Sequence, residues 1–148
     1  MKRGWPARAL AVVVAVLGAA TTGASRAAPD VLHGEQVYVR CMACHALAND
    51  RVGPHHCGLF GRLAGSVPNF DYSPAMKRAN IVWNDKTLDR FLAAPLKMVP
   101  GSSMTYDGMA DPKDRSDLIA YLKRANELPA CAPRAPDAGG AKADRLRR

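Results

Sequence analysis

The sequence lacks several patterns that would assign it to common protein classes. It shows no internal repeat and no alternating strand pattern, which argues against a fold built on a sheet. The formal net charge of +8 belongs largely to the two ends, because the segment 29–128 holds twelve basic and eleven acidic side chains. A nucleic-acid-binding protein needs a basic face within its fold. The sequence therefore argues against that class.

Cysteine is scarce, and its spacing argues against two common uses. Of the four cysteines, Cys41 and Cys44 are separated by two residues, whereas Cys57 and Cys131 form no such pair. A zinc finger needs a second closely spaced ligand pair, and a thioredoxin-like motif needs a βαβ context. Neither is present. Because His45 directly follows Cys44, the pattern is CxxCH, which predicts covalent attachment of a c-type haem with the imidazole as proximal iron ligand.

Residues 1–28 have the pattern of a secretory signal peptide. A basic start precedes an apolar run from 9 to 20 and then a stretch of small residues. The run is too short for a stable transmembrane span. We expect cleavage near Ala27, with cleavage after Ala24 as the second choice and an uncleaved anchor as the alternative. Export to the periplasm agrees with the motif, because bacteria attach haem covalently outside the cytoplasmic membrane.

Removing residues 1–28 leaves one small domain, 29–128, and a basic tail, 129–148. We expect the tail to be disordered, because it lacks hydrophobic periodicity and has few large hydrophobic residues. Helices are predicted after capping residues: Asp30, Ser73, Asn84 and Asp111. The expected ranges are 31–41, 74–79, 85 to the residue before Pro95, and 112 to about 125.

The segment from His45 to Pro74 is rich in glycine and proline and has no lasting period. A loop of this length is unusual in a compact domain unless it surrounds something other than protein core. A haem in the centre of the domain would remove the difficulty. The expected fold is therefore all-α, with three to four helices and long loops around one covalently bound haem.

Motifs in a fixed order along residues 31–127 resemble the class I cytochrome c family, particularly bacterial periplasmic and mitochondrial-like members. The motifs are Gly34–Tyr38 before CxxCH, Val52–Pro54, Gly58–Arg62, Phe70–Ser73, Trp83, Pro100–Met104 and Asp117–Lys123. The resemblance implies the small cytochrome c fold, in which the first and last helices cross. Several independent motifs make it far more specific than CxxCH alone.

The resemblance also implies roles for individual residues. Cys41 and Cys44 would carry the thioether bonds, and His45 would be the proximal ligand. The carbonyl of Pro54 would accept a hydrogen bond from the other ring nitrogen of His45 and fix the ring's orientation. Met104 matches the distal ligand. Four methionines lie downstream of the motif, but Met104 alone follows a Pro-Gly turn, and Met109 is the second choice.

Further positions either match or depart from the family pattern. Tyr72 and Trp83 match residues that hydrogen-bond a buried haem propionate, and Arg62 matches an arginine that helps to neutralise it. His56 stands where the family usually has an apolar residue, commonly leucine, in contact with the haem. Three roles are open for His56: a solvated side chain, a group that tunes the redox potential of the haem, or an alternative ligand of the iron. Phe91 replaces a tyrosine that often hydrogen-bonds the methionine sulfur.

The two remaining cysteines, Cys57 and Cys131, suggest a disulfide in an exported protein, although a sequence does not give the geometry that such a bond needs. The pair would tie the loop after the motif to the end of the last helix.

Histidine and methionine together close both axial positions of an iron and raise its potential. We therefore expect a monomeric one-electron carrier and not an enzyme. It would dock transiently, at the exposed haem edge, on redox-protein donors and acceptors, and would meet the membrane only through partner complexes. The alternatives are a monohaem c-type oxidoreductase, which would need an open distal position and acid–base groups such as His55 or His56, and a subunit of a periplasmic dehydrogenase complex.

Overall fold

The computed structural model describes residues 27–132. Its elements, in chain order, are α1 (Val31–Tyr38), η1 (Val39–Cys41), α2 (Pro74–Lys77), α3 (Asp85–Ala93), α4 (Pro95–Met98), α5 (Pro112–Ala125) and η2 (Pro129–Cys131). Within these residues there is no strand, and the sheet-like pairing is limited to an isolated bridge between Leu63 and Val82. The all-α prediction is confirmed. Nearly all of the predicted signal peptide, and the tail beyond residue 132, lie outside the described residues.

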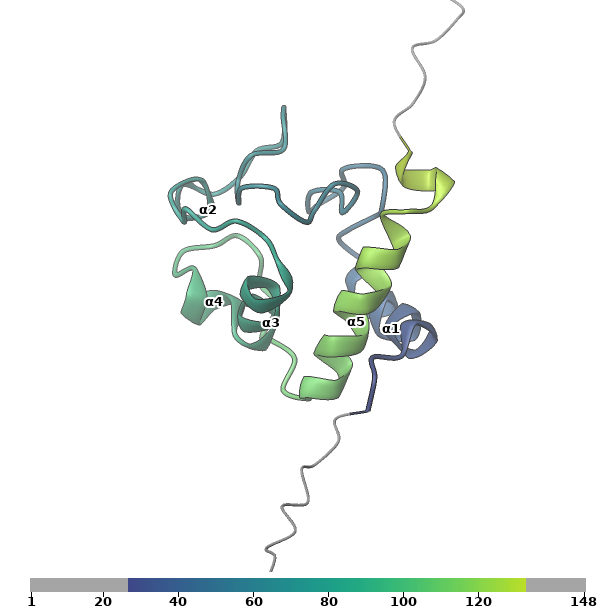
Figure 1. The fold of residues 1–148 in the computed structure, drawn as a ribbon. Helices are drawn as coiled ribbons and strands as arrows, with labels where there is room; N and C mark the ends of the chain where they lie inside the picture. Colours follow the sequence, from purple (N-terminus) through teal and green to yellow (C-terminus); the bar gives the residue numbers. More distant parts are fainter. Residues whose placement is uncertain (1–26, 133–148) are drawn as a thin grey trace, which may run out of the picture.

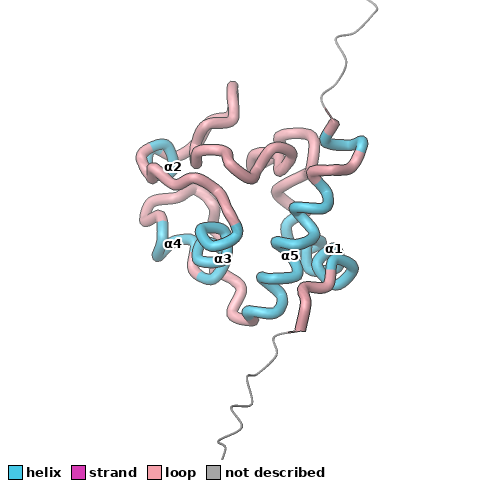
Figure 2. The backbone as a smooth tube through the Cα atoms, in the orientation of Figure 1, coloured by secondary structure: helices cyan, strands magenta, loops and turns pink. Residues whose placement is uncertain are grey.

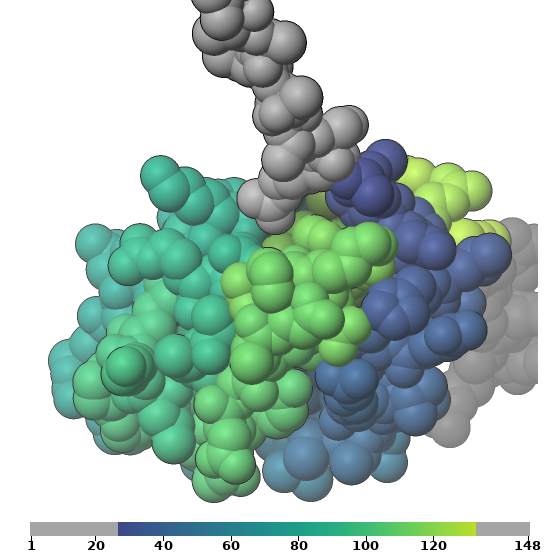
Figure 3. Space-filling view, turned by 90° about the horizontal axis from the view of Figure 1, so that it is seen from below, coloured from purple at the N-terminus to yellow at the C-terminus, as the bar shows by residue number. Residues whose placement is uncertain are grey.

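The helices form two groups with a long loop across one end. In Figure 1, α1 and α5 lie together on one side, and α2, α3 and α4 lie on the other. The loop from 42 to 73, called the long loop below, connects the two groups (Figure 2). Seen from below, the green residues of the α5 region lie between the blue N-terminal part of the domain and the teal middle segment (Figure 3). In the described part of the chain, no helix has both the length and the apolar character to cross a membrane.

Each of the longer helices begins at a capping residue that the sequence predicts. The Asp30 side chain accepts hydrogen bonds from two backbone N–H groups of α1, and Asp111 accepts one from α5. Asn84 and Thr87 form a reciprocal capping box at the start of α3, and Ser73 caps α2. These bonds satisfy backbone N–H groups that have no partner within the helix. Helix starts are therefore encoded locally in this chain.

Two helix ends differ from the prediction. The helix expected to end before Pro95 does so, although α3 stops at Ala93, one residue earlier than expected, and Pro95 begins α4, which was not predicted. Proline is tolerated there because the first helical position needs no backbone N–H partner. The predicted helix 74–79 is also shorter, since α2 ends at Lys77.

The crossing of α1 over α5 depends on a glycine. A Cβ atom on Gly34 would lie 2.0 Å from the carbonyl oxygen of Asp117. No side chain can occupy that space, so glycine is required for the backbones to approach so closely. Val37 and Leu118, next to the crossing, are buried. The cost of glycine within a helix is offset here by the close packing of the two helices.

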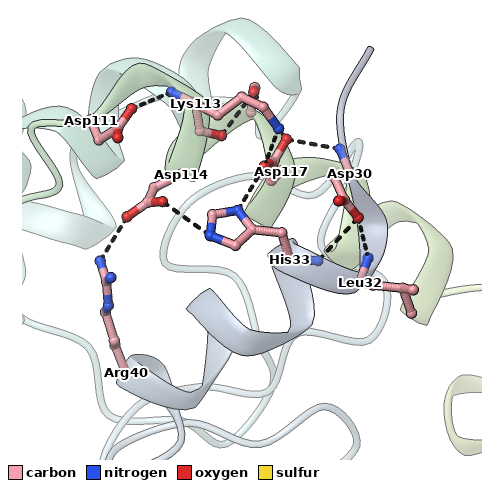
Figure 4. A network of polar contacts seen from close by, with 9 residues as sticks. Asp30, Leu32, His33, Arg40, Asp111, Lys113, Asp114 and Asp117 are labelled. Carbon is pink, nitrogen blue, oxygen red and sulfur yellow. Dashed lines mark hydrogen bonds and ion pairs between the residues drawn. The ribbon is translucent and has the colours of Figure 1, made fainter. Parts of the chain in front are cut away.

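A polar network, which the sequence analysis did not predict, joins the same two helices (Figure 4). The Asp117 side chain is completely buried and accepts hydrogen bonds from His33 Nδ1 at 2.8 Å and Lys113 Nζ at 2.5 Å. It also accepts one from the backbone N–H of Asp30 at 2.9 Å. Burial alone would raise the pKa of Asp117, but these bonds outweigh it and lower the pKa to about 2. The carboxylate therefore stays charged in the folded protein.

The end of the domain is attached to the long loop. Cys57 and Cys131 form a disulfide, with their Cα atoms 5.1 Å apart, in agreement with the pairing suggested by the sequence. The Asn126 side chain accepts a hydrogen bond from the Gly58 N–H at 2.5 Å and donates one to the His56 carbonyl at 3.3 Å. The predicted disordered tail therefore does not begin at Pro129, because η2 is ordered by the disulfide.

Candidate functional site

A cavity of about 340 Å³ lies between the long loop and the helices. Its volume falls within the range of roughly 300–1,000 Å³ that is usual for small-molecule sites. All the site residues predicted from the sequence line it: Cys41, Cys44, His45, Pro54, Arg62, Tyr72, Trp83 and Met104. They come from η1, the long loop and the segments on either side of α3 and α4. The fold thus brings together groups that are distant in the sequence.

The His45 ring is held in one orientation by the loop that follows it. Its Nδ1–H donates a hydrogen bond of 2.7 Å to the Pro54 carbonyl, as the resemblance implied. A Cβ atom on Gly53 would lie 2.3 Å from the His45 ring, so only glycine permits this approach. Burial lowers the pKa of His45, although the Pro54 carbonyl acts in the opposite direction. The imidazole is therefore neutral, and its second nitrogen has a lone pair for a metal.

The cysteines of the motif, Cys41 and Cys44, take no part in the disulfide, which joins the other two. A turn at the end of η1 brings them to the cavity wall: the N–H groups of Cys44 and His45 donate to the Cys41 carbonyl at 3.1 and 2.9 Å. Burial raises the pKa of the Cys41 thiol to about 11. Both cysteines line the cavity, so both are placed for covalent attachment of a group bound there.

Three methionines line the cavity: Met76, Met104 and Met109. Met76 lies in α2 and is buried, and Met109 is also buried, with its N–H bonded to the Leu92 carbonyl. Met104 is half-buried in the irregular segment after the turn at Gly101, and its N–H donates to Ser102 Oγ at 3.2 Å. Met98, the fourth candidate, lies away from the cavity wall.

Polar and aromatic groups occupy another part of the wall. Arg62 donates hydrogen bonds to the carbonyls of His55 and Cys57 at 2.9 and 3.0 Å, and burial lowers the pKa of Arg62. Burial raises the pKa of Tyr72. Trp83 is buried, with its ring 5.0 Å from the ring of Phe91. A cation, a phenol and an indole thus line one cavity.

His56 has surroundings that the sequence analysis did not predict. Its ring lies nearly parallel to that of His45, at a centroid distance of 4.5 Å and an interplanar angle of 20°. Its Nδ1 is joined to the Tyr38 hydroxyl by a hydrogen bond of 3.1 Å. Burial lowers the pKa of His56 to about 3, with a further contribution from the positive charge of Arg62, so the ring is neutral. The polar residue at this position was recognisable in the sequence, but its partner on α1 was not.

Comparison with known proteins identifies the family. The cytochrome c family model matches residues 31–126. The chain belongs to the cytochrome c family. It is 41% identical over 117 residues to cytochrome c2 from Rhodomicrobium vannielii, which covers 76% of this chain and 94% of that protein. It is also 40% identical over 100 residues to cytochrome c from Sesamum indicum, covering 65% of this chain and 90% of that protein.

A solved structure supports the same assignment. Cytochrome cH from Methylobacterium extorquens aligns with a TM-score of 0.63 and 38% sequence identity, covering 64% of this chain and 98% of that chain. As a cytochrome c, the protein is an electron carrier and not an enzyme, and it carries one covalent haem c through its CxxCH motif. The cavity fits this group, since its wall combines two free thiols, a neutral imidazole with one nitrogen already bonded, and largely apolar side chains.

Proposed function

We propose that this cytochrome c is a periplasmic one-electron carrier whose haem iron is held by His45 and Met104. The observation that carries the proposal is that both side chains line the same cavity, together with the hydrogen bond from His45 Nδ1 to Pro54. A haem with histidine and methionine ligands supplies reversible one-electron chemistry and has no open position for a substrate. The protein's part is to fix the ligands, limit the access of water and present an edge for docking.

Met104 is favoured over the other two methionines on the wall by its backbone. Met76 is part of a helical turn, and the N–H of Met109 is bonded to the end of α3. Both side chains are nearly completely buried among the hydrophobic residues of the core. Met104 follows the turn at Pro100 and Gly101, in a segment without helix. A half-buried methionine on such a segment can direct its thioether into the cavity without leaving a gap in the core.

The other wall residues have matching roles in the proposal. Cys41 and Cys44 carry the thioether bonds. Tyr72 and Trp83 hydrogen-bond a haem propionate, and Arg62 helps to neutralise it. The location of the last three side chains on the wall and the cationic charge of Arg62 support these roles. Burial strengthens each such contact, because charges interact more strongly where water is excluded.

The proposal also includes export and transient partners. Residues 1–28 would act as a signal peptide that is cleaved near Ala27, releasing a monomer into the periplasm. Redox-protein donors and acceptors would dock weakly at the haem edge, as is usual for electron-transfer encounters. The molecular mass of the secreted holoprotein tests the cleavage site. Purification without detergent then separates a free carrier from a subunit, because a subunit would co-elute with a large partner.

The ligand assignment is tested by a matched series of substitutions. Met104→Leu, Met76→Leu and Met109→Leu each replace a methionine with a residue of similar volume, so packing changes little. The oxidised wild type should show the methionine–iron charge-transfer band in its visible spectrum. We expect Met104→Leu to abolish the band and the two control variants to retain it. If Met109→Leu abolishes it instead, or if the wild type lacks it, the assignment of Met104 is wrong.

A further inference from the structure

Two residues outside the proposed ligand set, His56 and Tyr38, lie next to His45: the His56 ring stacks on the His45 ring, and Tyr38 contacts His56. The His56 ring covers one face of the His45 ring, 4.5 Å away and nearly parallel, and the Tyr38 hydroxyl bonds His56 Nδ1 at 3.1 Å. Tyr38 comes from α1, and its ring lies 5.2 Å from that of Tyr121 on α5. A continuous series of contacts therefore runs from the helix crossing to the face of the imidazole.

The contact with His56 restricts a motion that the Pro54 hydrogen bond leaves free. One hydrogen bond at Nδ1 fixes the position of that nitrogen, but the His45 ring can still tilt about a line through its Cβ and Nδ1. A flat group against the ring face prevents the tilt. His56 supplies a flat ring at a small interplanar angle of 20°. The two contacts thus constrain the imidazole in complementary directions.

His56 is itself held firmly enough to act in this way. Its backbone N–H donates to the carbonyls of Ala46 and Leu47 at 3.1 and 3.0 Å, and its carbonyl accepts from Asn126 at 3.3 Å. With the backbone fixed, the remaining freedom lies in the side chain. The Tyr38 hydroxyl removes most of it, because an imidazole bonded at Nδ1 cannot turn without losing that bond.

We propose that Tyr38 and His56 form a positioning pair, in which the hydroxyl of Tyr38 holds the His56 ring against His45 and so fixes the plane of the axial imidazole over the haem. The inference rests on the proposed function, because it takes His45 as the proximal ligand. Groups that orient a ligating histidine tune the metal that it binds. Tyr38 and His56 are thus positioning residues, and neither contributes a ligand.

The bond between the two side chains persists over a wide pH range. Burial raises the pKa of Tyr38 to about 12. The phenol is therefore protonated at any pH at which the protein works. A neutral phenol beside a neutral imidazole forms one hydrogen bond without the desolvation cost of a buried charge.

The test removes one oxygen atom and reads out the orientation of His45. Tyr38→Phe keeps the aromatic ring and deletes the hydroxyl that bonds His56. Tyr121→Phe is the matched control, because it deletes a neighbouring tyrosine hydroxyl on α5 that has no hydrogen bond to His56. In the oxidised holoprotein, the hyperfine-shifted haem methyl resonances report the plane of the axial histidine. We expect Tyr38→Phe to change the order or spread of these shifts and Tyr121→Phe to leave them as in the wild type.

A second pair of variants separates positioning from simple packing. His56→Leu should change the methyl shifts at least as much as Tyr38→Phe does. The double variant Tyr38→Phe/His56→Leu should match His56→Leu alone, because the hydroxyl has then already lost its partner. Additive changes in the double variant, or wild-type shifts in both single variants, would overturn the proposal.

The same spectra distinguish a failure of this inference from a failure of the proposed function. A wild-type protein without a histidine-ligated haem would lack the hyperfine pattern altogether, and the proposed function would then fail. A normal wild-type pattern that is insensitive to Tyr38→Phe and His56→Leu would leave the carrier intact and remove the positioning role. Thermal unfolding of each holoprotein variant shows whether a spectral change accompanies a loss of fold, and a change seen only in unfolded samples counts against the proposal.

Discussion

Replacing Cys57 and Cys131 with serine removes the covalent link between the long loop and η2. The two residues are separated by 74 positions in the sequence, so the bond closes a large loop in the unfolded chain. Opening it restores about 15 cal/mol/K of chain entropy to the unfolded state, which corresponds to about 4.4 kcal/mol at room temperature. The Cys57→Ser/Cys131→Ser variant should therefore be less stable than the wild type by about 4 kcal/mol.

The assay is denaturant unfolding of the oxidised holoprotein, followed by the visible and far-UV signals. Thermal unfolding gives a second measure: for a domain of roughly 100 residues, the expected loss lowers Tm by about 20 °C. In a separate comparison with both haems in the ferrous state, the wild type treated with a thiol reductant should unfold like the variant treated in the same way. Both proteins retain the haem thioethers, so the comparison isolates the disulfide.

Two results would refute this reasoning. The first is an equal denaturation midpoint for the wild type and the variant, which would mean that the cross-link does not restrict the unfolded chain. The second is the release of two free thiols from the denatured, unreduced holoprotein, which would mean that Cys57 and Cys131 are not bonded. A loss well below the predicted value, by contrast, would indicate residual structure in the unfolded state.

Two further predictions concern the crossing of α1 and α5. Gly34→Ala should lower the free energy of unfolding by about 1–3 kcal/mol or more, because the added Cβ would lie 2.0 Å from the Asp117 carbonyl oxygen. Denaturant titration measures this loss. An unchanged free energy of unfolding would contradict the prediction, because it would show that the two helices can move apart freely. Asp117 has a pKa lowered from 3.8 to about 2 in the folded protein, so its contribution to stability is complete above pH 3.8 and is lost as the pH falls through about 2. Unfolding measured across this window should be less dependent on pH in Asp117→Asn than in the wild type, and an equal slope in the two proteins would contradict the assignment.

Much of this fold could be predicted because the decisive signals are local. Asp30, Asn84 and Asp111 are short polar residues directly before helical segments, and each satisfies backbone groups two or three positions away. The CxxCH motif is local as well. The hydrogen bond from His45 to Pro54 spans nine positions and was accessible because the family resemblance covers both residues.

The features that escaped prediction depend on residues far apart in the chain. An aspartate within a helix is usually exposed to solvent. The burial of Asp117 depends on its hydrogen bonds with Asp30 and His33, which come from the other end of the domain. The partnership of Tyr38 with His56 likewise needs the path of the long loop around the cavity. Pro95 illustrates a local ambiguity, because proline both follows helices and begins them, and the sequence offers no rule that separates the two cases here.

The disulfide also bears on the order of events by which this protein matures. Four cysteines allow three pairings, and the proposed export would bring the chain into oxidising conditions. Once Cys41 and Cys44 are bonded to haem, a single pairing of the remaining sulfurs is left, and it is the one that secures the long loop to η2. In a chain that oxidises first, two of the three pairings join a motif cysteine to Cys57 or Cys131. The third pairing joins Cys41 to Cys44 and prevents both from bonding to haem. An order in which haem attachment precedes oxidation would therefore exclude the wrong disulfides.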